Sequence, residues 1–136
     1  MKLFLKILLG CIQVSCMNQK SSPENGQSKS NLLSTDFYHL EPHLILDCVE
    51  KHGFLPTGEI QQLNSYENRV FDIQLEPVDN QKQNLIAKFY RPGRWSLETL
   101  FDEHNFEIEL KNESLQVAAP YILKNKSTVD SVNGIY

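Results

Sequence analysis

The most informative stretch of this sequence is NLIAKFYRPGRW, residues 84–95. It reads as an apolar strand that ends at a Pro-Gly turn, with Lys88 near its centre. On strand alternation one face carries Ile86, Lys88 and Tyr90, and the other carries Leu85, Ala87 and Phe89. Taking the ammonium group out of water is costly unless a partner is supplied. The strand therefore predicts a carboxylate partner for Lys88 elsewhere in the chain.

A helix is predicted over Ser96 to about Ser114, with Ser96 as N-cap. Glu103 shares one side of this helix with apolar residues, namely Leu100, Phe106 and Leu110. A buried ammonium and a buried carboxylate on adjacent elements offset each other's desolvation by pairing, so we expect Lys88 to contact Glu103. The alternative is a lysine that extends to water and a solvated glutamate.

Two further residues near this helix are assigned to packing. His104 lies on the apolar stripe of the helix, so we expect a packed or hydrogen-bonded core histidine rather than a ligand or base. Trp95 follows the turn from Arg91 to Arg94 and could stack on an arginine. We interpret it instead as packing that fixes the start of the helix.

The other elements predict an α+β domain, an antiparallel β-sheet with one long helix. A short helix is expected in EPHLILDCVEKHGF, residues 41–54, with Pro42 in its first turn. The strand-like runs are GEIQQL (58–63), RVFDIQLE (69–76) and NLIAKFY (84–90), with a polar turn over 77–83, a further strand from Tyr121 and another beginning at GIY (134–136). Short local connections predict that the first three strands form an antiparallel meander.

The N-terminal segments differ from the rest. Residues 1–16 resemble a secretory signal or an upstream extension, and Leu8-Leu9-Gly10-Cys11 resembles a lipobox, which leaves a lipoprotein anchored through Cys11 as an alternative. Residues 17–36 are rich in Ser, Asn, Gln and Lys, and this composition predicts a disordered leader. The compact domain is expected over residues 37–136.

Composition narrows the function classes. The chain has 136 residues and a formal net charge of −4, so its charge gives no reason to expect nucleic acid or an anionic membrane as partner. Three cysteines at Cys11, Cys16 and Cys48 fit neither a redox pair nor a zinc site, and we expect a reducing compartment with Cys48 as a packing residue. No metal site is expected in this chain.

A polar loop joins the first two strands in LNSYENRVF, residues 63–71. Such a loop can fold over a bound nucleotide and offer donors to its phosphates. The chain has no glycine between Gly58 and Gly93, so Ser65 and Asn68 would supply side-chain donors instead. The alternative is an ordinary polar hairpin loop.

Four segments together resemble a known family. LNSYENRVF, AKFYRPGRW, DEHNFEIEL and VAAP, in this order and spacing, resemble the N-terminal lobe of the bacterial stress response kinase A family. These are serine/threonine protein kinases within the wider aminoglycoside phosphotransferase and choline kinase-like group. The resemblance covers about residues 37–136.

The resemblance implies ATP with Mg²⁺ as cofactors and a cytoplasmic location. It implies that Lys88 contacts the phosphates, that Glu103 holds Lys88, and that Ile86 helps to form the adenine pocket. Asn68 corresponds to the asparagine of the family's ATP-covering loop, and Glu67 replaces a serine there; Ser65 lies in the same loop.

The family's catalytic residues are expected outside this chain. A His-Gly-Asp motif is absent, so the resemblance implies a truncated lobe without catalytic residues or metal ligands, whose partners are ATP, a protein substrate and a separate C-terminal lobe. Phosphoryl transfer by this chain alone is not expected. The alternatives are a non-catalytic binding module derived from such a lobe, or a fragment of a small-molecule phosphotransferase.

Overall fold

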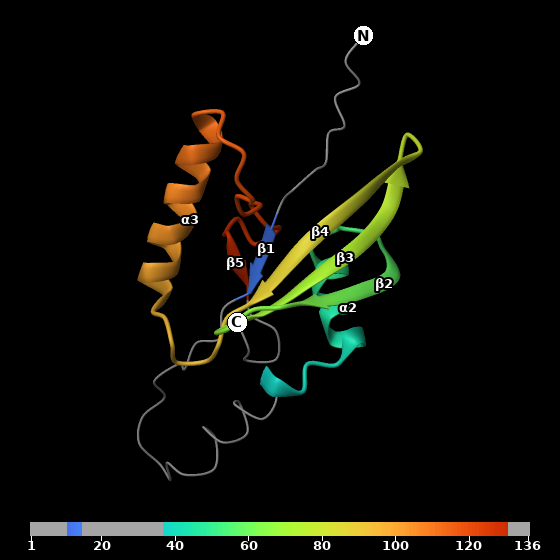
Figure 1. The fold of residues 1–136 in the computed structure, drawn as a ribbon, viewed down its shortest axis with the longest axis horizontal. Coiled ribbons are helices and arrows are strands. Elements are labelled where there is room, and N and C mark those ends of the chain that lie inside the picture. The colour runs from blue at the N-terminus through green and yellow to red at the C-terminus, as the bar shows by residue number, and fades with distance from the viewer. Residues whose placement is uncertain (1–10, 15–36, 131–136) are drawn as a thin grey trace.

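The computed structural model describes residues 11–14 and 37–130, and within them it shows an α+β fold (Figure 1). The elements are β1 (Cys11–Val14), α2 (Pro42–Lys51), β2 (Pro56–Leu63), β3 (Arg69–Val78), β4 (Gln81–Phe89), α3 (Leu97–Asn112) and β5 (Val129–Asp130). The sheet has the strand order β2-β3-β4-β1-β5. In Figure 1, α3 stands on the side of the sheet that carries β1 and β5, whereas α2 lies on the side that carries β2 and β3.

The predicted meander of β2, β3 and β4 is confirmed. Both pairs are antiparallel, and Val70 of β3 lies opposite Lys88 of β4. The connecting turn is tighter than the polar run over 77–83 suggests, because the strands continue to Val78 and Gln81. The two residues between them, Asp79 and Asn80, have φ of 51° and 59°. Positive φ at both central residues matches the twist of the strands, so the hairpin closes in two residues.

One face of β3 and β4 forms the core with α2. Alternation along the two strands buries Phe71, Ile73, Leu75, Leu85, Ala87 and Phe89. The helix contributes Ile45, Cys48 and Val49 to the same cluster, as the apolar spacing of its sequence predicts. Cys48 is therefore a packing residue, as expected. Lys88 points to the opposite face from this core, because it is offset by one residue from Ala87 and Phe89.

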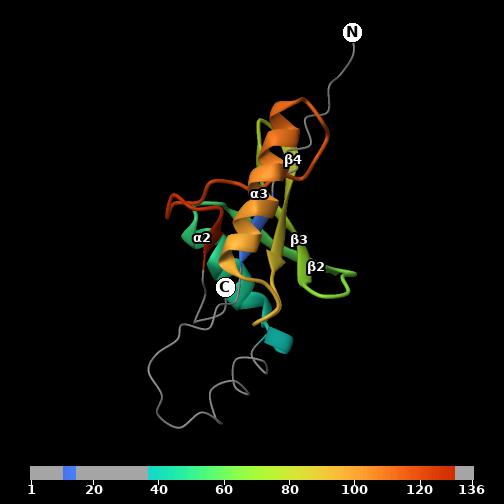
Figure 2. The same cartoon turned by 90° about the vertical axis from the view of Figure 1, so that its left-hand side faces the viewer.

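The long helix α3 begins where the sequence predicts. Ser96 has an extended backbone, and its hydroxyl accepts a hydrogen bond from the Thr99 amide at 3.1 Å. This cap satisfies one of the free amides at the helix start, and Glu98 lies in the first turn. Only Leu100 and His104 are buried among the residues of α3, so the helix has a narrow contact face. Figure 2 shows its length along the sheet.

The last described part of the chain differs from the prediction. No strand begins at Tyr121 within residues 37–130; the segment instead forms a turn in which the Leu123 amide donates to the Ser127 carbonyl, and only Val129–Asp130 are a strand. The sequence also does not predict β1, which pairs in parallel with β4 and β5 and makes the sheet mixed. The strand expected at 134–136 and the leader at 17–36 lie outside the described residues.

Candidate functional site

Lys88 and Glu103 contact each other. The Lys88 ammonium nitrogen lies 3.0 Å from Oε1 of Glu103, and it also lies 4.6 Å from the centre of the Tyr90 ring. Strand β4 positions the lysine on the face away from the core, and the helix α3 presents the glutamate to it. A charge-assisted hydrogen bond therefore joins the two elements.

The sequence predicts that both members of this pair are buried, and this prediction is wrong for Glu103. The side chain of Lys88 is 22% exposed, whereas that of Glu103 is 41% exposed. Phe106, which was expected to cover Glu103, is itself 60% exposed. On α3 only Leu100 and His104 are buried, so the side chain of Glu103 keeps contact with solvent. The pair is thus open to a ligand from one side.

His104 is the buried polar residue behind the pair. Its Nε2 lies 3.1 Å from the Tyr90 hydroxyl, and its Nδ1 lies 2.7 Å from the Thr128 hydroxyl. Burial lowers the pKa of His104 from 6.5 to about 4; Glu103 opposes this shift and Lys88 adds to it. The imidazole is a neutral, hydrogen-bonded core residue, as the sequence predicts.

The 64–68 loop between β2 and β3 holds the other predicted residues. Ser65 is exposed at its tip. The Asn68 side chain is engaged, because its Oδ1 accepts a hydrogen bond from the Arg91 amide at 3.3 Å. This contact joins the base of the loop to the residues just after β4. Asn68 lies two residues before Val70, the residue of β3 that pairs with Lys88. Ile86 is partly buried on the same face as Lys88.

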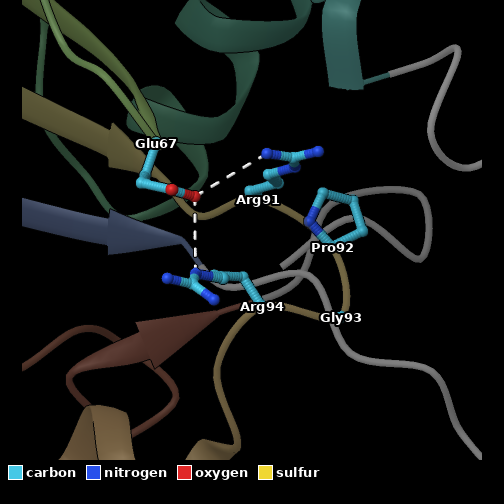
Figure 3. A pocket seen from close by; sticks show the side chains of 5 residues that line it. All are labelled: Glu67, Arg91, Pro92, Gly93 and Arg94. Carbon is cyan, nitrogen blue, oxygen red and sulfur yellow. Dashed lines mark ion pairs between the residues drawn. The ribbon is translucent and has the colours of Figure 1, made fainter.

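A second charged cluster lies beside this loop and was not predicted as a site (Figure 3). Oε2 of Glu67 lies 3.7 Å from a terminal nitrogen of Arg91 and 3.5 Å from Nε of Arg94. With Pro92 and Gly93 these residues line an open hollow of about 350 Å³. The sequence feature that could have indicated this cluster is an acidic residue in the loop, Glu67, together with two arginines three positions apart in a turn, Arg91 and Arg94.

Trp95 also corrects a prediction. Its ring lies 5.1 Å from the Arg94 guanidinium carbon, and the side chain is exposed rather than packed at the helix start. The arginine stacking that the sequence left as an alternative is therefore the arrangement observed.

Neither a metal cluster nor a membrane helix is found in the described ranges. Residues 11–14 and 37–130 hold no group of three or more His, Cys, Asp or Glu side chains suited to a metal ion. The same ranges contain no helix that is both long and apolar enough to cross a bilayer.

Comparison with known proteins supports the resemblance. No family model matches the chain. It is 37% identical over 100 residues to stress response kinase A of Escherichia coli K12 and to that of Shigella flexneri, over 74% of this chain and 29% of each relative. It is 39% identical over 84 residues to the serine/threonine protein kinase RdoA of Salmonella typhimurium, over 62% of this chain and 24% of the relative. The chain thus spans less than a third of the length of these relatives.

Proposed function

We propose that this chain, a homologue of stress response kinase A over 100 residues, forms the nucleotide-binding lobe of a serine/threonine protein kinase. The observation that carries the proposal is the 3.0 Å contact between Lys88 on a strand and Glu103 on the following helix. Protein kinases use a lysine and a glutamate on these two elements to hold the phosphates of ATP.

The roles of the side chains follow from their positions. The ammonium of Lys88 binds the α- and β-phosphates of ATP, and Glu103 keeps the lysine in place. Because the pair is partly open to solvent, the phosphates can reach Lys88 without breaking its contact with the carboxylate. Ile86 supplies apolar surface for the adenine from the same face of β4.

The 64–68 loop covers the triphosphate in this proposal. Asn68 holds the base of the loop at the end of β4 through the Arg91 amide, so the loop starts close to the phosphates. Ser65 at the exposed tip then donates its hydroxyl to a phosphate oxygen. This loop uses side-chain donors because it contains no glycine.

Transfer of the phosphoryl group needs further residues. ATP with Mg²⁺ supplies the phosphoryl group, and the described residues contain no cluster that could hold the metal ion. We assign the base that accepts the substrate proton and the metal ligands to a separate C-terminal lobe, of the kind that the remaining length of the relatives allows. In this proposal the substrate is a protein, in line with the name of the Salmonella relative, and the kinase acts in the cytoplasm.

Titration calorimetry of the purified chain with ATP and Mg²⁺ tests the proposal. Lys88→Ala should weaken ATP binding by about tenfold or more, because a charge-assisted contact to phosphate is lost. Lys82→Ala is the matched control, since Lys82 lies exposed on the same strand and should leave the affinity unchanged. Equal ATP affinity of the wild-type chain and Lys88→Ala would contradict the assignment.

A further inference from the structure

The cluster of Glu67, Arg91 and Arg94 has more positive than negative charge. Two guanidinium groups share a single carboxylate oxygen, Oε2 of Glu67 (Figure 3). Each arginine side chain is about half exposed, at 50% and 52%. The hollow between them therefore has a formal charge of +1 and is open to solvent.

The carboxylate does not satisfy these arginines. The nitrogen–oxygen distances of 3.5 and 3.7 Å exceed those of hydrogen bonds to a guanidinium. Oε2 of Glu67 is buried and has no hydrogen-bond partner within the part of the chain that the structure describes. Glu67 thus lies between two donor groups without bonding to either.

The turn from Arg91 to Arg94 places the two guanidinium groups on either side of the hollow. The Arg94 amide donates to the Arg91 carbonyl at 3.3 Å, which closes the turn. Gly93 has φ of 72°, and a Cβ atom built on it would meet no atom within 4 Å, so the backbone leaves the hollow free. Arg94 is held against the Trp95 ring. A guanidinium fixed in this way loses less entropy when it binds an anion.

We infer that this cluster is a binding site for a phosphoryl dianion, which displaces the carboxylate of Glu67. A phosphate group has several acceptor oxygens and two negative charges, so it can bond to both guanidinium groups at hydrogen-bond distance. The displaced Glu67 releases the tip of the 64–68 loop, while the Asn68 contact with the Arg91 amide holds its base. The phosphoryl group comes either from free phosphate or from the terminal phosphate of a nucleotide.

Titration of the whole chain with inorganic phosphate, followed by calorimetry, tests the site. Arg91→Gln and Arg94→Gln should each weaken phosphate binding by about tenfold. Glu67→Gln should tighten it, because the competing negative charge is gone while the side-chain volume is kept. Lys82→Gln removes one exposed positive charge from the far end of β4 and serves as the control. Circular dichroism of each variant confirms that it is folded.

Two outcomes would overturn the inference. One is an Arg94→Gln chain that binds both inorganic phosphate and ATP as tightly as the wild type, and the other is a Glu67→Gln chain that binds neither of them more tightly than the wild type. Glu67→Gln is expected to bind phosphate more tightly than the wild type, and a misfolded chain would not do so. This variant therefore tests the inference even if an arginine variant fails to fold.

The same variants identify the source of the phosphoryl group and separate this inference from the proposed function. If Arg94→Gln weakens binding of ATP but not of AMP, the site takes the terminal phosphate of the nucleotide. If it weakens binding of free phosphate and leaves ATP binding intact, the site takes free phosphate. Loss of inorganic phosphate binding in Lys88→Ala, with full binding in Arg91→Gln and Arg94→Gln, would place the anion at Lys88 and overturn the inference.

Discussion

Nδ1 of His104 lies 2.7 Å from the hydroxyl of Thr128, and this contact joins α3 to the segment just before β5. The other ring nitrogen meets the Tyr90 hydroxyl at the end of β4. A neutral imidazole has one donor and one acceptor, and each hydroxyl can serve as either. Both nitrogens of the neutral ring therefore have a partner, and burial, which lowers the pKa of His104, favours this uncharged state. The network joins three separate parts of the chain.

The His104 network predicts a loss of stability in mild acid. The folded chain holds the pKa of His104 at about 4, whereas the unfolded chain has the ordinary value of 6.5. Between these values the unfolded state binds the proton first, so stability is full above pH 6.5 and falls as the pH drops toward 4. We expect the free energy of unfolding by urea to fall by about 2 kcal/mol between pH 7 and pH 5 from this group.

Two variants isolate this contribution. His104→Gln lacks the titrating group, so its stability should vary less with pH over the same range, although it is less stable throughout. His43→Gln changes an exposed histidine on α2 and should keep the wild-type pH dependence. Identical pH profiles for wild type and His104→Gln would show that the ring is not held neutral.

The Lys88–Glu103 pair should contribute little to stability. Both side chains retain contact with water, and ion pairs of this kind contribute about 0–1 kcal/mol. We expect Glu103→Gln to lower the free energy of unfolding by less than about 1 kcal/mol while it weakens ATP binding. Urea denaturation and ATP titration of one preparation check both parts. A loss of several kcal/mol would instead indicate a structural role for the pair.

The β3–β4 turn should be sensitive to the side chain at position 80. Asn80 has φ of 59°, a conformation that costs most L-residues about 1–2 kcal/mol and glycine almost nothing. Asn80→Gly should therefore raise the melting temperature, and Asn80→Ala should lower stability by about 1 kcal/mol. Gln81→Ala, at the exposed first residue of β4, is the control and should change little. The same melting temperature in both Asn80 variants would rule out this turn geometry.

Cys48 should be unreactive while the chain is folded. Burial raises the pKa of its thiol to about 12; Asp130 adds to this shift and Lys51 opposes it. The thiolate that reacts with disulfide reagents is then almost absent at pH 8. In a Cys11→Ser, Cys16→Ser background, labelling should be slow and should rise in parallel with unfolding by urea. Rapid labelling without urea would contradict the burial of this thiol.

Several features could be predicted from the sequence, because they depend on interactions between residues that are close together in the chain. The Ser96 cap, the first turn of α2 at Pro42 and the alternation that buries Ala87 and Phe89 each depend on residues only a few positions apart. The Lys88–Glu103 contact was predicted for the same reason, since the two residues lie on consecutive elements joined by a short turn.

The strands at the far edge of the sheet were not predictable in this way. The parallel pairing of β1 with β4 joins residues more than seventy positions apart, and the two-residue β5 has too little sequence to signal a strand. The same limit applies to the contact between Glu67 and Arg94, because it depends on where the 64–68 loop folds back.

By itself, the sequence determined the β2–β3–β4 meander, the two helices, the buried position of His104 and the ammonium–carboxylate pair, because hydrophobic periodicity, capping and short connections act locally. Only the tertiary structure decided how much of the predicted apolar side of α3 is buried. Leu100 on that side is buried, whereas Phe106 and the Glu103 carboxylate beside Lys88 keep contact with water. The physical reason is that the burial of a helix face is set by the summed packing of distant segments, which neither the spacing of Leu100, Glu103 and Phe106 nor any other local pattern contains.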